Sequence, residues 1–375
     1  MMKSEHTGLY VHIPFCLKKC HYCDFYSKVT TDTEMDAYVH ALCCEIVSYR
    51  REPKITLDTV FFGGGTPTLL GTKRLLTILY AVFDTFSVLQ NAEISIEMNP
   101  ATADETMLSH LREAGWNRVS VGVQSMVDIE LKALGRVHTA EDARRSLDAI
   151  IGAGFANYSV DLMYAIPHQT LDSFRYTVEQ IMAYQPPHIS LYSLIVEEGT
   201  PFWEQKDRLN LPDENRELDM YHLATDYLSS LGYQHYEISN YARSGYHSRH
   251  NFRYWTLSPY IGVGPAAHSF FEGKRYENVA SIEAYLASPL SARQIEEIPN
   301  MADLAEEYVM LGLRTSEGIS LATYEQHAGH PLLKGKEEWL KQCQREGYVE
   351  LEGDRLRFTE KGFYLSLGML AELLS

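Results

Sequence analysis

The sequence predicts an α/β fold built on parallel strands, arranged either as a barrel or as an open sheet. Two observations lead to this prediction. Short β-rich runs alternate with longer helical patterns six times in series, and the β-rich runs are apolar almost throughout, as buried parallel strands are. The runs cover residues 8–13, 58–63, 93–98, 118–123, 158–164 and 188–194. In such folds ligands bind at the carboxyl ends of the strands, so we expect the site there.

The connecting segments have helical periodicity and, in several places, helix start and stop signals. We expect helices near residues 33–51, 72–86, 103–114, 140–153, 170–184 and 214–231. Thr102, Thr139 and Asp213 are the expected N-caps, and Gly115, Gly154 and Gly232 are the expected stops.

The pattern changes after residue 233. Residues 239–275 are rich in Tyr, His, Gly and Ser and lack clear periodicity, which predicts an irregular but ordered segment. Further on, three helices, a hairpin in YVELEGDRLRF and a last helix resemble a winged-helix module. We therefore divide the chain into a barrel (1–235), a connecting segment (236–300) and a small C-terminal winged-helix-like domain (301–375).

Composition limits the classes of function. Of the 375 residues, 45% are hydrophobic and 22% charged, which is typical of soluble globular proteins. The sequence contains no apolar run long enough for a transmembrane segment and no signal-peptide pattern at its start, so we expect a cytoplasmic protein with reduced cysteines. The formal net charge of −17 opposes nucleic-acid binding, and a structural or docking role is therefore expected for the winged-helix-like domain.

Three cysteines follow the first predicted strand in a C-x3-C-x2-C arrangement: Cys16, Cys20 and Cys23. A [4Fe–4S] cluster normally takes four cysteines, so three local ligands leave one iron open to a small molecule. The amino and carboxylate groups of S-adenosylmethionine suit that iron. The alternative is a structural zinc ion with His12 or His21 as fourth ligand, although no second pair of cysteines accompanies it. Cys43, Cys44 and Cys343 lie in helical patterns and are expected to be small apolar side chains.

The segment YVHIPFCLKKCHYCDF strongly resembles the start of the radical S-adenosylmethionine (radical SAM) superfamily, specifically the group around oxygen-independent coproporphyrinogen III oxidase. The resemblance covers roughly residues 8 to 370 and implies a partial (β/α)6 barrel. The supporting motifs, in chain order, are GGGTP, EMNP, VGVQS, LGRVH, DLMYAIPHQT and HNFRYW.

The resemblance also implies which residues bind S-adenosylmethionine. Its methionine part is expected to contact the glycine-rich end of the second strand, where the absence of Cβ atoms lets backbone amides approach a ligand. A second S-adenosylmethionine, as in the oxidase, is an alternative partner for some of these residues. The expected contacts are Gly64, Gly65 and Thr66 for the methionine part, Glu97 for the ribose or amino group, Gln124, Arg136 and Asp161 as polar partners, and Tyr10 and Tyr22 for the adenosyl group.

Two departures from the oxidase pattern favour a different function. The oxidase carries a fourth cysteine two positions after the third, where this chain has Phe25, and it has an N-terminal arm for which no room exists before Cys16. In both features, and in the motif HNFRYW (250–255), the sequence resembles the HemW-type haem chaperones. These proteins bind haem and deliver it to respiratory enzymes. The runner-up is coproporphyrinogen III oxidase, whose decarboxylation chemistry Phe25 makes doubtful. A third alternative is a zinc-stabilised DNA-binding regulator.

His250 is the expected haem ligand, because histidine is a common proximal ligand of haem iron. Tyr254 and Trp255 are expected to face the porphyrin, and Arg249 or Arg253 to pair with its propionates. The alternative is that this motif only bonds and packs within the fold, with His268 as a rival ligand.

Overall fold

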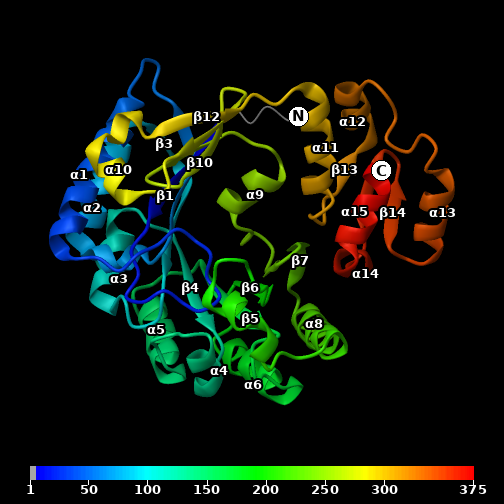
Figure 1. Cartoon of the computed structure of the whole chain (residues 1–375), viewed down its shortest axis with the longest axis horizontal. Coiled ribbons are helices and arrows are strands. Elements are labelled where there is room, and N and C mark those ends of the chain that lie inside the picture. Colours follow the sequence, from blue (N-terminus) through cyan, green and yellow to red (C-terminus); the bar gives the residue numbers. More distant parts are fainter. Residues whose placement is uncertain (1–5) are drawn as a thin grey trace.

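The computed structural model describes residues 6–375 and has two parts, a large α/β unit and a smaller C-terminal unit beside it (Figure 1). The six predicted strands are confirmed. They are β1 (Thr7–Ile13), β2 (Thr56–Gly64), β3 (Ser87–Met98), β4 (Arg118–Gln124), β5 (Tyr158–Tyr164) and β6 (His188–Ser193), and all neighbours among them pair in parallel.

Further strands extend this parallel core at both ends into one twelve-stranded sheet of order β12-β11-β10-β9-β1-β2-β3-β4-β5-β6-β8-β7. β9 is parallel to β1, whereas β8 is antiparallel to β6. The sheet is not closed by pairing between its two edge strands β12 and β7, in agreement with the expected partial barrel. The added strands are β7 (Gln234–Glu237), β8 (Asn240–Ala242), β9 (Tyr260–Val263), β10 (His268–Phe271), β11 (Lys274–Asn278) and β12 (Arg293–Glu297).

Alternation along β1 shows how the sheet separates core from site. Leu9, Val11 and Ile13 are fully buried and belong to the main hydrophobic core between the sheet and the outer helices. Tyr10 and His12 point to the opposite face, because successive side chains of a strand alternate. The concave face of the sheet therefore carries polar and aromatic side chains, and the site is built there.

The outer helices follow the expected strand–helix order and lie around the sheet in Figure 1. Thr139 and Asp213 cap their helices as predicted. Thr102 does not: Asp104 is the N-cap, and the Thr102 hydroxyl donates to the carbonyl oxygen of Asn99 at 2.6 Å instead. These elements are α1 (Asp32–Ser48), η1 (Pro67–Leu70), α2 (Gly71–Thr85), α3 (Glu105–Ala114), α4 (Asp128–Ala133), α5 (Ala140–Gly152), α6 (Leu171–Met182), α7 (Pro201–Glu204), η2 (Lys206–Arg208) and α8 (Glu214–Ser230).

The expectation of an irregular segment over 239–275 was wrong. It holds strands β8 to β11 and helix α9 (Arg249–Trp255), followed by α10 (Ile282–Ala287) and η3 (Pro289–Ser291). Its strands have only three to five residues and α9 only seven, so none is long enough to display a clear period.

The C-terminal unit has its own buried core, and the expected hairpin is present as β14 paired with β15. Backbone hydrogen bonds join this unit to the barrel: Ile238 N to Arg314 O (3.0 Å) and Ser316 N to Tyr236 O (2.9 Å). Between residues 6 and 375, no helix combines the length and apolar character that a bilayer crossing requires. The elements are α11 (Met301–Gly312), β13 (Ile319–Ser320), α12 (Leu321–Ala328), α13 (Glu337–Arg345), β14 (Val349–Glu352), β15 (Arg355–Phe358), α14 (Glu360–Tyr364) and α15 (Ser366–Leu374).

Candidate metal and cofactor site

The three motif cysteines lie on the loop that leaves the carboxyl end of β1. Backbone hydrogen bonds fix this loop at its base, where Cys16 N donates to Lys28 O and Lys28 N donates to Pro14 O (3.0 and 2.8 Å). His21 N, at the far end of the loop, donates to Leu134 O at 3.0 Å. Cys16, Cys20 and Cys23 all line one cavity of about 410 Å³ at the carboxyl ends of the strands.

Two of the three sulfur atoms receive hydrogen bonds from residues that the motifs had singled out. The Thr66 hydroxyl donates to Cys16 Sγ at 3.7 Å, and Arg136 Nη1 donates to Cys20 Sγ at 3.6 Å. Such donors stabilise thiolates, the form in which cysteine binds iron. In the described part of the chain no three Cys, His, Asp or Glu side chains converge tightly enough to hold a single metal ion. The cysteine group is thus defined by its shared loop, cavity and sulfur-directed donors.

The structure brings most of the predicted cofactor residues to the walls of this cavity. Three strands, β2, β3 and β4, contribute residues from their carboxyl ends, as the strand-end rule requires, whereas the others come from the middle of β5, from the cysteine loop and from the segment between α4 and α5. The predicted residues that line the cavity are Tyr22, Gly64, Gly65, Glu97, Gln124, Arg136 and Asp161.

Tyr10 and Thr66 do not line the cavity. The Tyr10 hydroxyl lies 2.8 Å from His12 Nδ1, and His12 Nε2 lies 3.0 Å from the carbonyl oxygen of Tyr26. Because a carbonyl only accepts, His12 Nε2 carries the proton, and Nδ1 therefore accepts from Tyr10. Thr66 sits behind the cavity wall, where its hydroxyl accepts from Asn99 Nδ2 (2.7 Å) while it donates to Cys16. Both hydroxyls are thus engaged with neighbouring side chains, and their contacts with the cofactor stay a prediction.

Two half-buried carboxylates line the cavity. Glu97 Oε2 accepts from Gly64 N at 3.0 Å, and Asp161 accepts from the hydroxyls of Ser120 (3.0 and 3.1 Å) and Ser159 (3.3 Å). Burial, reinforced by the nearby Asp161 charge, raises the pKa of Glu97 to about 7. Burial also raises the pKa of Asp161. These groups are suited to a ligand that brings positive charge or hydroxyl donors, both of which S-adenosylmethionine has.

Arg136 is already engaged within the protein. Its Nη2 donates to Asn99 Oδ1 (2.5 Å) and to the carbonyl oxygen of Gly122 (2.6 Å), while Nη1 donates to Cys20 Sγ. The guanidinium therefore joins the cysteine loop to the ends of β3 and β4. This use of its donors differs from the expected free fork that would bind a ligand carboxylate.

Gly65 is required for a close approach of two backbone segments. A Cβ atom placed there would lie 2.7 Å from Phe15 O, 2.8 Å from Phe15 N and 2.9 Å from Ile13 O. Gly65 N also donates to Ile13 O at 2.8 Å. The glycine-rich end of β2 thus packs directly on the start of the cysteine loop, and this contact positions Cys16.

Several cavity residues were not singled out from the sequence: Asn99, Ser120, Met163, Tyr192 and Ile195. Asn99 could have been predicted from the sequence, since it belongs to the same EMNP motif as Glu97. Ser120 and Met163 differ by an even number of positions from Gly122 and Asp161 on their own strands, so strand alternation would have found them. Tyr192 near the end of β6 and Ile195 just after it belong to no motif.

His250 lies on α9 and is completely buried. Its Nδ1 is 2.9 Å from Thr59 Oγ1 and its Nε2 is 3.0 Å from the Tyr254 hydroxyl. Its ring stacks on Phe61, with ring centroids 5.2 Å apart. Both ring nitrogens are occupied, so iron coordination by His250 requires one of these bonds to break and α9 to move.

The arginines expected to pair with propionates also bond within the fold. Arg253 forms an ion pair with Asp58, and its Nε donates to Thr59 Oγ1 at 3.1 Å. Arg249 Nη1 donates to the carbonyl oxygen of Asn91 at 2.7 Å. The rival ligand His268 is exposed and lies 3.5 Å from Glu296.

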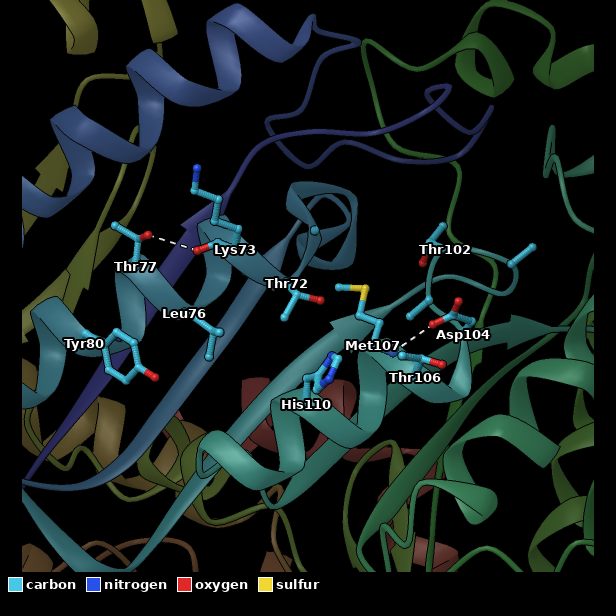
Figure 2. Close-up of a pocket in the computed structure, with 13 residues that line it drawn as sticks. Thr72, Lys73, Leu76, Thr77, Tyr80, Thr102, Asp104, Thr106, Met107 and His110 are labelled. Atoms are coloured by element: carbon cyan, nitrogen blue, oxygen red, sulfur yellow. Dashed lines mark hydrogen bonds between the residues drawn. The ribbon is translucent and has the colours of Figure 1, made fainter.

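A larger hollow of about 1080 Å³ lies between α2 and α3 (Figure 2). Its lining includes Leu76, Tyr80, Met107 and His110, and it shares no residue with the cysteine cavity. The dashed bonds in Figure 2 run within α2, from Thr77 to Lys73, and from Met107 N to the α3 cap Asp104.

A cysteine triad with an adjoining cavity, at the carboxyl ends of a parallel partial barrel, defines a member of the radical SAM superfamily. Comparison with known proteins agrees: the Radical SAM superfamily profile matches residues 10–181, and the HemN C-terminal domain profile matches residues 301–365. The chain belongs to the family of the heme chaperone HemW. It is 34% identical to the Lactococcus lactis heme chaperone HemW over all of this chain and 98% of that protein, and 38% identical to the Synechocystis one over 84% and 80%.

Two further likenesses extend the comparison. The chain is 32% identical to the mitochondrial radical S-adenosyl methionine domain-containing protein 1 of Bos taurus, over 99% of this chain and 88% of that protein. Among solved structures, coproporphyrinogen III oxidase (HemN) from Escherichia coli superposes with a TM-score of 0.85 at 24% identity, over 99% and 91% of the two chains. At that identity the likeness shows a shared fold.

We expect Glu97→Ala to weaken S-adenosylmethionine binding about ten- to hundredfold, the usual loss for a hydrogen bond to a charged group. Iron content should stay unchanged, since Glu97 bonds the Gly64 amide and not a residue of the cysteine loop. Equilibrium dialysis with labelled cofactor measures the affinity, and Glu113→Ala on the exposed face of α3 is the matched control. Equal affinities for Glu97→Ala and the control would place the ligand elsewhere.

The same carboxylate predicts a pH dependence. With a pKa of about 7, Glu97 loses its negative charge as the pH falls below 7. The wild type should therefore bind S-adenosylmethionine more weakly at pH 6 than at pH 8. Glu97→Gln should be weaker at both values and should lack this step in a dialysis series across the range.

Proposed function

We propose that this protein is a radical SAM haem chaperone that carries a [4Fe–4S] cluster on Cys16, Cys20 and Cys23, binds S-adenosylmethionine in the adjoining cavity, and delivers haem to respiratory enzymes from the cytoplasm. The observation that carries the proposal is the match to heme chaperones along the whole chain, C-terminal unit included. The cysteine loop, its sulfur-directed donors and the polar cavity support the cofactor assignment.

A cluster held by Cys16, Cys20 and Cys23 would supply the electron for reductive cleavage of the sulfonium of S-adenosylmethionine. The chain's own residues bind and orient. Arg136 holds the cysteine loop against β3 and β4, and the Gly64 amide orients Glu97 toward the cavity. Asp161 is held by two serine hydroxyls, which keep an acceptor available for a ligand hydroxyl or amine.

Coproporphyrinogen III oxidation is the second candidate, favoured by the shared fold. Position 25 argues against it. Phe25 lines the mouth of the cavity with 65% of its surface exposed, at the place where the oxidase pattern has a fourth cysteine. The side chain there offers apolar contact in place of a thiol.

One experiment separates the two candidates. Anaerobically reconstituted protein is mixed with haem and, separately, with coproporphyrinogen III. The chaperone proposal expects a stable complex with a shifted Soret band and no carbon dioxide release. Appreciable turnover of coproporphyrinogen without a stable haem complex would overturn the proposal in favour of the oxidase.

The axial ligand His250 stays a prediction. If it binds the iron, His250→Ala changes the position of the Soret band as well as the affinity, because the ligand type changes. If it keeps the buried bonds to Thr59 and Tyr254, the variant loses stability and leaves the haem spectrum unchanged. Absorption spectra with thermal unfolding curves of the same samples distinguish these results.

A further inference from the structure

A cavity of about 500 Å³ lies between the edge of the barrel and the C-terminal unit, next to the cofactor cavity. The two cavities share the wall Tyr192, Ser193 and Ile195, at and just beyond the end of β6. Cavities between structural units are frequent ligand sites. None of the residues assigned above to the cluster, to S-adenosylmethionine or to haem lines this second cavity.

The walls are aromatic and aliphatic. Tyr364 and Leu367 from α14 and α15 face Tyr192 and Ile195 from the barrel side. These side chains are unusually exposed for their size, with 40% exposure at Tyr364, 73% at Leu367 and 66% at Ile195. Such a set of flat and apolar surfaces gains free energy when a planar apolar ligand removes it from water.

Arg314 is the positively charged side chain on the wall of this cavity. It lines the cavity and is half-buried, yet within residues 6–375 its side chain makes no ion pair and no hydrogen bond. The other charged residue on the cavity wall, Glu217, accepts a hydrogen bond from Ser193 Oγ at 2.5 Å. In a chain of net charge −17, an arginine left without a carboxylate partner at an apolar cavity is a site for a ligand carboxylate.

The cavity is held rigidly, which favours binding. The carbonyl oxygen of Arg314 accepts from Ile238 N at 3.0 Å, so the arginine is anchored at the junction of the two units. On the other side, Glu360 at the start of α14 pairs with His235 (2.8 Å) and accepts from the Tyr221 hydroxyl (2.9 Å). Both contacts tie the C-terminal unit to the barrel.

We infer that this cavity is where haem is received, with the porphyrin against Tyr364, Leu367 and Ile195 and a propionate on Arg314. The inference rests on the proposed haem chaperone function and names the place where that function is performed. It sets the haem beside the cofactor cavity, separated by Tyr192 and Ile195, and away from the buried α9.

The test compares haem with haem dimethyl ester, whose propionates are blocked, on the full-length reconstituted protein. The wild type should bind haem about tenfold more tightly than the ester, the usual effect of one charge-assisted hydrogen bond. Arg314→Ala should lose that tenfold preference for haem while binding the ester as before. Leu367→Ser should weaken both ligands alike, because it removes apolar contact only.

Matched controls keep the test independent of folding. Arg345→Ala and Leu290→Ser replace exposed residues away from the cavity and should change neither affinity. Iron content and circular dichroism should be unchanged in every variant. If the wild type binds haem while Arg314→Ala and Leu367→Ser bind it with wild-type affinity, the cavity assignment is overturned and the proposed function stands. If the wild type binds no haem at all, both are overturned.

Discussion

Replacing Cys16, Cys20 or Cys23 with alanine is expected to abolish cluster assembly. Anaerobic reconstitution of the wild type should give about four iron and four sulfide per chain, with an absorption band near roughly 400 nm that bleaches on reduction. Each variant should lose both, because a cluster that has only three protein ligands does not tolerate the loss of one. Iron and sulfide analysis with absorption spectra measures the result.

Cys43→Ala and Cys343→Ala are the matched controls. Cys43 lies on α1 and Cys343 is buried on α13, and neither lines the cofactor cavity. Both should assemble a full cluster. Recovery of one tightly held zinc ion and no iron–sulfur band from carefully reconstituted wild-type protein would contradict the assignment and revive the structural zinc alternative.

Gly65→Ala is expected to cause the second largest loss of bound iron and of stability, although it adds a single methyl group. The added Cβ would lie 2.7 Å from Phe15 O and 2.8 Å from Phe15 N, both backbone atoms that cannot turn aside. Overpacking of this kind costs about 1–3 kcal/mol. The cysteine loop must shift, so we expect less iron per chain and a lower melting temperature together.

Gly368→Ala is the control for this variant. Nothing lies within 4 Å of a Cβ added at Gly368 in α15, so iron content should match the wild type and the melting temperature should not fall. A Gly65→Ala protein with a full cluster but weakened S-adenosylmethionine binding would show that Gly65 acts on the ligand alone, as the sequence had suggested. Iron analysis and cofactor dialysis on one preparation decide between the two.

Regular parts of the fold were predictable because long apolar runs and capped helices leave a strong local pattern. The strands β1 to β6 and the caps Thr139 and Asp213 are where the sequence places them. The segment around α9 was not predictable, since its short elements are fixed by distant partners. The α9 amides, for example, bond Glu93 from β3, which is more than 150 residues away in the chain.

The candidate site was also predictable only in part. Most of the motif residues meet at one cavity, because the ends of parallel strands come together there whatever the detailed packing. The direction of each side chain depends on neighbours that a motif does not contain. The Tyr10 hydroxyl bonds His12. The Arg136 guanidinium donates to Asn99, Gly122 and Cys20. The cavity that Arg314 lines joins segments far apart in sequence, and no local pattern marks it.

Because β1 lies inside the sheet, the cysteine loop can reach its final structure only late in the synthesis of the chain. β1 pairs with β2 on one edge but with β9 on the other, and the Tyr26 hydroxyl at the end of the loop accepts from Ile282 N, 256 residues along the chain. At ribosomal rates of about 5–20 residues per second, those partners emerge roughly 10–50 s after the cysteines. The three thiols therefore spend that interval outside their final pocket, which is complete only after residue 282 has been synthesised.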